Sequence, residues 1–293
     1  MKSDEQIPGR RKVLRAAVFL GTAVASGLLI GKEAGAPGHT VARPVLGTGT
    51  RPAAGAPPAQ APPLTPPNAA AYRLRPMTGQ GAPPRRRALP AVRTRPILSL
   101  PEPTAHGLVL TFDDGPDPRY TPAILRTLRR HDVRAMFFVC GEMAVDNREL
   151  LRQMAADGHV IGNHTWSHPL LTKLSRSAIL SEVGRTSELV ARTVGEAPQW
   201  FRAPYGAWNR AAFEIGAGLG MEPLAWTVDS LDWTEPGTTT ISRRVLDQAE
   251  PGAIVLAHDA GGDRSQTVRA LAGYLPELLD RGYVMTLPRQ AVV

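Results

Sequence analysis

Two adjacent carboxylates and two closely spaced imidazoles are the residues of this 293-residue chain best suited to chemistry. Asp113 and Asp114 end an apolar run and precede Gly115-Pro116, which predicts a strand that terminates in a turn. Neighbouring carboxylates repel each other, so a cation or an arginine is expected nearby. His164 and His168 follow a later apolar run. On one helical turn their spacing aims both rings at one point, and two histidines with one carboxylate are a common catalytic zinc set.

The elements that must position these residues alternate between short strands and helices after about Pro101. The predicted strands are short and apolar and cover residues 108–112, 135–139, 160–163, 199–202, 224–228, 254–258 and 284–287. The predicted helices cover residues 121–130, 148–157, 175–194, 210–219, 241–249 and 267–281, and glycines end three of them. This alternation predicts an α/β fold, a distorted (β/α)7-8 barrel, with the Asp pair and the His pair at carboxyl ends of strands.

Charge is divided unevenly along the chain. Residues 1–100 carry 15 Lys and Arg against 3 Asp and Glu, whereas residues 101–293 carry 19 against 23. The basic residues are dispersed among prolines and lack interleaved aromatics, so nucleic-acid binding is not expected. The basic character therefore belongs to the N-terminal third and not to the domain that holds the carboxylates.

The first 36 residues have the layout of an export signal or membrane anchor. Arg10-Arg11 precede an uncharged apolar segment, residues 16–30, and the arginine pair resembles a twin-arginine signal. The apolar segment is shorter than the ~20 residues of a typical spanning helix. Ala34-Gly35-Ala36 has a small-x-small pattern, but Pro37 directly after it is unfavourable for cleavage. We expect an exported protein, secreted or membrane-anchored.

Residues 37–100 read as a disordered linker. They include 14 prolines together with many Ala, Gly, Thr and Arg. Such a composition favours extended polyproline-like conformers and offers too few periodic apolar residues to offset the entropy of ordering. The arginines of this segment are either contacts to anionic wall polymers or phospholipid, or simply a solvated tether. The catalytic domain is predicted to begin at residue 101.

Several further residues are singled out by type alone. The single cysteine, Cys140, follows an apolar run and is expected to be a buried, unreactive thiol. Asp229 either supports the site or caps a turn, and Asp259 has no assigned role. Trp166 and Trp208 either offer their faces to a sugar ring or are buried. Surface positions are expected for the histidines without a motif, which are His39, His106, His131 and His159.

Five short motifs in order resemble those of the polysaccharide deacetylase family, which is carbohydrate esterase family 4 with its NodB-homology domain. The motifs are T-F-D-D-G-P at 111–116, H-T-W-S-H at 164–168, R-A-P-Y at 202–205, D-S-L-D-W at 229–233 and L-A-H at 256–258. No key position departs from the family pattern, and the resemblance covers about residues 105–290. It implies a distorted (β/α) barrel and a metal-dependent N-deacetylase that acts on amino-sugar polymers.

The resemblance also implies a role for each site residue. It makes Asp114, His164 and His168 the metal ligands and Asp113 the general base, with Arg202 contacting that base. A base of this kind must not be consumed by coordination, because the attacking water still needs a proton acceptor. The metal implied is a divalent ion, with zinc favoured and cobalt or another transition metal as alternatives.

The remaining roles implied by the resemblance concern the leaving group and the acetyl pocket. His258 matches the general acid and Asp232 the carboxylate that holds it, since an adjacent carboxylate raises the pKa of an imidazole. The backbone N–H of Tyr205 matches the oxyanion donor. Pro204, Trp233 and Leu256 match positions that line the acetyl pocket. For Trp233 and Leu256, packing in the core is an equally good interpretation.

The predicted function is removal of N-acetyl groups from an amino-sugar polymer by a monomeric exported enzyme. Peptidoglycan, at its GlcNAc or MurNAc residues, is favoured because an export segment and a long linker would place the domain at the wall. Chitooligosaccharide and acetylxylan are alternatives, because they need the same base, metal and oxyanion site. A small-molecule imide or ureide hydrolase and a wall-binding pseudoenzyme are weaker hypotheses.

Overall fold

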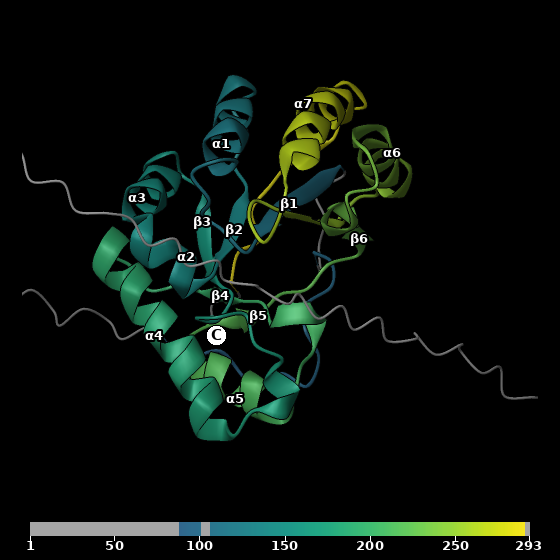
Figure 1. Ribbon diagram of the computed structural model, residues 1–293. Helices are drawn as coiled ribbons and strands as arrows, with labels where there is room; N and C mark the ends of the chain where they lie inside the picture. The colour runs from purple at the N-terminus through teal and green to yellow at the C-terminus, as the bar shows by residue number, and fades with distance from the viewer. Residues whose placement is uncertain (1–87, 101–105, 291–293) are drawn as a thin grey trace, which may run out of the picture. The chain divides into compact units, whose positions relative to one another are not determined.

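The structure is a computed structural model that describes residues 88–100 and 106–290. It is an α/β fold in which strands of a curled sheet are covered by helices (Figure 1). The named strands of the described ranges form one eight-stranded sheet with parallel pairings. They are β1 (Gly107–Asp113), β2 (Met136–Val139), β3 (Val160–Asn163), β4 (Trp200–Phe201), β5 (Glu222–Pro223), β6 (Val228–Asp229), β7 (Ile254–His258) and β8 (Val284–Met285).

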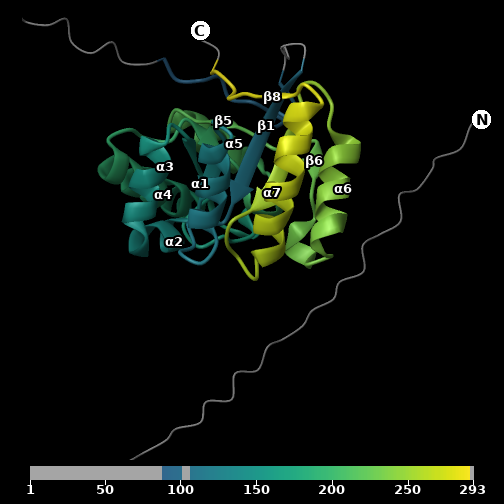
Figure 2. The same ribbon diagram turned by 90° about the horizontal axis from the view of Figure 1, so that it is seen from above.

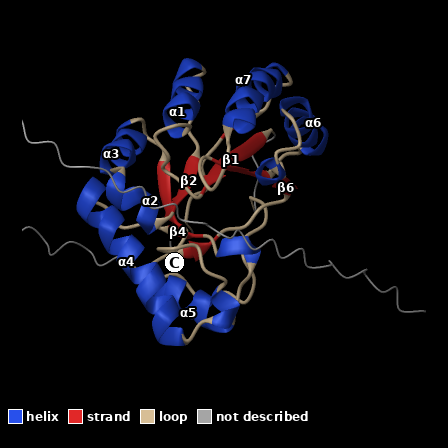
Figure 3. Ribbon diagram, viewed as in Figure 1, coloured by secondary structure: helices blue, strands red, loops and turns tan. Residues whose placement is uncertain are grey.

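Helices pack on the outer face of this sheet, as Figures 2 and 3 show from two directions. Their apolar faces bury leucine, isoleucine and methionine side chains against the strands. In the described ranges they are α1 (Thr121–Arg130), α2 (Gly141–Asp146), α3 (Arg148–Ala156), α4 (Arg176–Val194), α5 (Arg210–Gly218), α6 (Thr238–Gln248) and α7 (Ser265–Asp280). Short 3₁₀ turns follow some strands, at Leu171–Lys173, Pro204–Gly206 and Asp232–Thr234.

The sheet curls into a half-barrel. Its strand order is β5-β4-β3-β2-β1-β7-β6, with β8 paired to the start of β1. The connections are βα units, so the carboxyl ends of β1, β3 and β7 lie at one edge of the sheet. This architecture agrees with the predicted distorted barrel and brings the Asp pair, the His pair and His258 to the same edge.

Alternation along β1 decides which side chains face the barrel interior. Leu108, Leu110 and Phe112 pack outward into the core that the helices cover. Val109 belongs to a second cluster on the inner face, and Thr111 and Asp113 share its side of the strand. Asp113 therefore lies inside the barrel and is 2% exposed. Leu110 and Phe112, on the other side of the strand, stabilise it by packing into the core.

Residues 93–100, which lie in the predicted linker, contact the sheet. Ile97 pairs with Leu224 beyond the end of β5, and Ser99 pairs with Ala253 before β7. Arg93 also forms an ion pair with Glu222 on β5, at 2.5 Å. Arg93, Ile97 and Ser99 therefore contact residues of the sheet and of the segments beside it, and the predicted boundary at residue 101 stays a prediction. The predictions for residues 1–87 lie outside the described residues.

Two other predictions about the elements are corrected. Residues 224–228 were expected to form one strand, but β5 and β6 are two-residue strands on opposite edges of the sheet, and the chain crosses between them. Helix α2 was not predicted, because six residues are too few to show a helical period. The predicted glycine ends of α4, α3 and α7 are confirmed by positive φ angles at Gly195, Gly158 and Gly282.

Two residues without a motif are buried. Cys140 is buried as expected, and burial raises the pKa of its thiol well above the ordinary value. His159 was expected at the surface, but it is 6% exposed and its Nδ1 accepts the backbone N–H of Ala135 at 3.1 Å. Its position directly before β3, where the chain enters the sheet, explains the difference. No helix within the described ranges is long and apolar enough to cross a membrane.

Candidate active site

Asp113 forms a buried ion pair with Arg202. The Arg202 side chain is fully buried, and its Nη1 lies 2.7 Å from Asp113 Oδ1. Its remaining N–H groups donate to Thr111 Oγ1 at 2.8 Å and to two backbone carbonyl oxygens, and its plane lies over the Phe138 ring. Four hydrogen bonds thus hold the guanidinium, which fixes both the cation and the carboxylate.

The environment of Asp113 favours proton acceptance. Burial raises the pKa of this carboxyl above its ordinary value, and the charge and hydrogen bond of Arg202 oppose that rise. Arg202 therefore does not simply acidify its partner, because desolvation of the carboxylate is the larger effect. A carboxylate with a raised pKa is a better general base than an exposed one.

Asp114 points toward the two histidines instead of toward Arg202. Its φ of 77° turns the chain sharply after β1. His164 Nε2 lies 3.5 Å and His168 Nε2 3.4 Å from Asp114 Oδ1. One ligand atom from each of the three residues lies within 4.8 Å of the others. The prediction that adjacent carboxylates divide between two partners agrees with this geometry.

The donor set fits a divalent metal. Asp114 Oδ1 is buried and has no hydrogen-bond partner among the described residues. His164 Nδ1 lies 2.8 Å from the carbonyl oxygen of Arg202, so this nitrogen carries the proton and Nε2 keeps its lone pair. Burial lowers the pKa of His164 to about 3, which keeps the ring neutral. A buried carboxylate oxygen with no hydrogen-bond partner in the described part of the chain, beside two imidazole rings, is the set of donor atoms found in transition-metal sites.

The His164–His168 segment is a loop and not the predicted helical turn. Thr165 and His168 both have positive φ angles. The loop is held by side chains at its base, since Asn163 Oδ1 accepts the N–H of Thr165 at 2.8 Å and Thr165 Oγ1 accepts the N–H of His168 at 3.2 Å. The two rings still converge, with centroids 4.9 Å apart. Spacing alone suggested a helix because an i, i+4 pair is the commonest way to aim two rings at one point.

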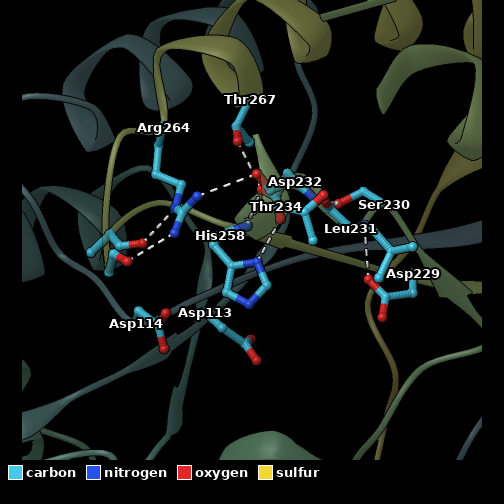
Figure 4. Close-up of polar contacts among 12 residues, drawn as sticks. Asp113, Asp114, Asp229, Ser230, Leu231, Asp232, Thr234, His258, Arg264 and Thr267 are labelled. Carbon is cyan, nitrogen blue, oxygen red and sulfur yellow. Dashed lines mark hydrogen bonds and ion pairs between the residues drawn. The ribbon is translucent and has the colours of Figure 1, made fainter. Parts of the chain in front are cut away.

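His258 and Asp232 form a second buried acid–base pair. His258 Nδ1 lies 2.6 Å from Asp232 Oδ1, and the backbone N–H of His258 donates to Asp232 Oδ2 (Figure 4). Burial alone would lower the pKa of His258, but the charge and hydrogen bond of Asp232, together with the charges of Asp114 and Asp113, raise this pKa to about 9. His258 is therefore protonated at neutral pH. Because His258 is the register partner of Asp113, these two residues lie on neighbouring strands.

The R-A-P-Y segment places Tyr205 next to the His164–His168 loop. Tyr205 has a φ of 60°, and its exposed ring meets the His168 ring edge-on at 4.6 Å between centroids. Pro204 is buried beside it. Leu256 is two residues before His258 and shares its face of β7, whereas Trp233 follows Asp232 and is 54% exposed. These positions agree with a site rim, and the acetyl-pocket roles stay predictions.

The two tryptophans and two aspartates left open in the sequence have structural partners. Trp208 stacks on Phe213 inside an aromatic cluster, while Trp166 lies under the guanidinium of Arg185 at 3.8 Å. Asp229 caps a turn by accepting the N–H of Leu231, at 2.9 Å.

Asp259 is a site-supporting residue that sequence reasoning left unassigned. Its buried carboxylate accepts the backbone N–H of Gly115 at 3.1 Å and the hydroxyl of Thr121 at 2.5 Å. It therefore holds the turn that follows Asp114. The available signal was its position directly after His258, at the end of a predicted strand.

Comparison with known proteins supports this arrangement. The family model described as polysaccharide deacetylase matches residues 101–224. A chitooligosaccharide deacetylase from Sinorhizobium fredii is 39% identical over 197 residues, which cover 63% of this chain and 92% of the relative. A peptidoglycan-N-acetylglucosamine deacetylase from Bacillus cereus is 38% identical over 183 residues, covering 62% of this chain and 66% of the relative.

A solved structure gives the same picture in three dimensions. A peptidoglycan N-acetylglucosamine deacetylase, crystallised with an N-hydroxybenzamide compound, superposes with a TM-score of 0.62 at 36% identity. The match covers 65% of this chain and 89% of that structure. With relatives more than a third identical over most of their length, and with the motif residues gathered at one edge of a curled parallel sheet, the chain belongs to the polysaccharide deacetylase family of enzymes.

Proposed function

We propose that this enzyme removes N-acetyl groups from peptidoglycan, acting at an N-acetylated amino sugar of the glycan. The proposal rests mainly on the positions of two ion pairs, Asp113–Arg202 and His258–Asp232. Asp113 and His258 lie on neighbouring strands, beside the possible metal ligands Asp114, His164 and His168. Amide hydrolysis needs a base that accepts a proton and an acid that gives one. A site with both, held in place by separate partners, meets that requirement.

In the proposed mechanism Asp113 takes the proton of the attacking water. Arg202 holds the carboxylate in one orientation, and Thr111 holds Arg202 in turn. Asp114, His164 and His168 would hold a divalent metal, which supplies Lewis acidity to the carbonyl and acidifies water. The backbone N–H of Tyr205 is the proposed hydrogen-bond donor to the negative charge that develops on the carbonyl oxygen.

Departure of the amine requires a proton, because an amide nitrogen anion is a very poor leaving group. His258 is the proposed donor, since Asp232 keeps its ring protonated at neutral pH. Burial alone would raise the pKa of Asp232, but the charge and hydrogen bond of His258 hold it below its ordinary value. Asp232 thus remains an anion throughout and orients the acid without competing for its proton.

The choice of peptidoglycan rests on the N-terminal sequence. Relatives that act on chitooligosaccharide and on peptidoglycan are almost equally identical to this chain, so identity does not choose between them. Residues 1–36 resemble an export segment, and the proline-rich stretch that follows gives reach. We infer an extracytoplasmic enzyme, exported through the twin-arginine route. A reporter fused to residues 1–40 should be exported only when that route functions, and export in its absence would contradict this route.

The substrate is tested by measuring acetate release from purified peptidoglycan, N-acetylated chitin oligomers and acetylxylan side by side. The expected result is the highest kcat/KM on peptidoglycan fragments. A clear preference for chitin oligomers would instead favour chitooligosaccharide deacetylation, and release from acetylxylan alone would contradict N-deacetylation. Activity on cyclic imides without activity on any glycan would favour the small-molecule hypothesis.

A further inference from the structure

Arg264 has a buried guanidinium group that binds backbone carbonyl oxygens. The residue is 3% exposed and sits at the N-terminal boundary of α7. Within the described residues it forms no ion pair with a carboxylate, although a buried cation normally has one. Its N–H groups instead donate to four carbonyl oxygens, those of Ala260 (2.7 Å), Gly261 (2.9 Å), Asp232 (3.3 Å) and Asp263 (3.3 Å). Figure 4 shows Arg264 beside Asp232.

One of these bonds reaches the acid pair. Arg264 donates to the main-chain carbonyl of Asp232, whose carboxylate holds His258. Thr267, in the first turn of α7, donates its hydroxyl to Asp232 Oδ2 at 2.8 Å. Arg264 lies directly before that turn, so its position also sets where Thr267 stands. The Asp232 residue is therefore held from its main chain and its side chain by neighbouring residues of one segment.

The other bonds hold a loop that touches the metal-ligand set. Residues 259–264 connect β7 to α7, and Gly261 lies so close to Asp114 that a Cβ on it would be 2.5 Å from Asp114 Oδ2. A Cβ on Gly262 would be 2.9 Å from Arg264 Nη2. The loop is thus enclosed between the guanidinium and Asp114, and both glycines have positive φ angles.

We propose that Arg264 is a positioning residue that fixes the His258–Asp232 pair and the Asp114 carboxylate in one geometry. It does so by tying loop 259–264 to the carbonyl oxygen of Asp232. Without it, four carbonyl oxygens would lose a charged donor, two of them on the buried residues Ala260 and Asp232, and the loop would have to shift to find other partners. A displacement of about 1 Å in such a site can cost about 100-fold in rate. This inference rests on the roles proposed for Asp114, Asp232 and His258.

The test compares Arg264→Met, which keeps the length of the side chain but removes the donors, with Arg264→Lys, which keeps the charge. Arg281→Met is the matched control, because Arg281 also donates to a backbone carbonyl, that of Leu246, but at the other end of α7. Three quantities are measured per folded molecule. They are kcat and KM for acetate release, metal affinity by competition with a chelator, and the pH titration of the His258 ring by NMR. The His258 signal is identified by its absence from the spectrum of His258→Gln.

For Arg264→Met we expect kcat to fall about 10- to 100-fold with little change in KM, together with weaker metal binding. The His258 ring should titrate at a lower pH than in the wild-type protein. Arg264→Lys should change the same quantities in the same direction but less, because an ammonium cannot span four carbonyl oxygens. Arg281→Met should match the wild-type values.

A folded Arg264→Met variant with unchanged metal affinity and His258 titration would overturn the proposal, because a purely structural arginine would lower only the folded fraction. If the methionine variant does not fold, the lysine variant is judged by the same two quantities, and wild-type values in it would equally overturn the proposal. The NMR titration needs no substrate. Failure of the peptidoglycan assignment would therefore show only in the acetate assay and would leave this test readable.

Discussion

Asp113 and Asp114 are neighbours in the chain, yet their main partners differ, although His164 Nε2 lies 3.6 Å from Asp113 Oδ2 as well as 3.5 Å from Asp114 Oδ1. Asp113 faces the barrel interior and Arg202, whereas Asp114, which itself has a positive φ, turns to His164 and His168. The division follows from geometry, because successive side chains of a strand point to opposite sides and the turn redirects the second one. One carboxylate can therefore accept a proton while the other stays with the donor set.

Replacing the proposed base tests this division. In Asp113→Asn we expect acetate release to fall about 100- to 10,000-fold, because an amide cannot accept the proton of the attacking water. Metal content should be unchanged, since the three proposed ligands remain, and both are measured on the same preparation by acetate assay and elemental analysis. Asp157→Asn, at an ion pair with Arg129 outside the site, is the control. A wild-type rate in Asp113→Asn would remove Asp113 as the base.

The pairing of His258 with Asp232 predicts a pH dependence. The pKa of His258 is raised to about 9, so its acid form is present below that pH and activity should be lost as pH rises through about 9. In Asp232→Asn the largest raising charge is gone, while burial still lowers the pKa of His258 and Asp113 and Asp114 still raise it, so the alkaline limb should move to a lower pH. The measurement is kcat/KM for acetate release across pH 5 to 10. An alkaline limb that stays in place would show that His258 is not the acid.

At the scale of elements, close contact between β2 and β3 supports the site. Gly162 on β3 is the register partner of Phe138 on β2, and a Cβ on Gly162 would lie 2.5 Å from the Phe138 ring. That ring in turn packs against the Arg202 guanidinium, 4.1 Å away. A glycine in the middle of a strand, normally unfavourable, is thus required by the aromatic residue that supports the arginine.

Gly162→Ala should therefore disturb both stability and activity. We expect a loss of about 1 to 3 kcal/mol in unfolding free energy from overpacking and a lower kcat from displacement of Arg202. Gly184→Ala is the matched control, because no atom lies within 4 Å of a Cβ there and α4 should gain up to about 1 kcal/mol from the better helix former. Denaturant unfolding and acetate release measure the two effects. Equal stability of the two variants would contradict the proposed contact.

At the scale of the whole molecule, burial of neutral histidines links stability to pH. Burial lowers the pKa of His159 to about 4, so the folded protein keeps this ring neutral while the unfolded chain binds a proton below about 6.5. Stability from this group is therefore present above about pH 6.5 and is lost as pH falls toward 4. His164, with its pKa lowered to about 3, acts in the same direction.

His159→Asn removes one of these titrations. The asparagine Oδ1 can replace the Nδ1 that accepts the N–H of Ala135, but it binds no proton in this range. Between pH 7 and pH 5 the variant should lose about 2 kcal/mol less unfolding free energy than the wild-type protein, as measured by denaturant titration at each pH. His131→Asn, at the partly exposed end of α1, is the control. Parallel losses in wild type and His159→Asn would contradict this origin of the acid sensitivity.

The sequence alone determined the parts of this protein that depend on short-range patterns. Apolar runs and glycine punctuation predicted the bounds of α1, β3 and β7, and the resemblance of five motifs predicted that the Asp pair, the His pair, Arg202 and His258 act together. The bounds of these elements are confirmed because strand and helix periodicity are local properties, and the joint action of the motif residues stays a prediction. Parallel βα topology then brings the strand ends to one edge.

Only the tertiary structure decided how the site is held. No local pattern indicates that Thr111 supports Arg202, that Asp259 holds the turn after Asp114, or that Arg264 binds carbonyl oxygens from two loops. Two-residue strands at the sheet edges and the loop form of the His164–His168 segment were also beyond its reach. The reason is physical: these features are contacts between segments far apart in the chain, and only strand register and packing bring their partners within hydrogen-bond distance.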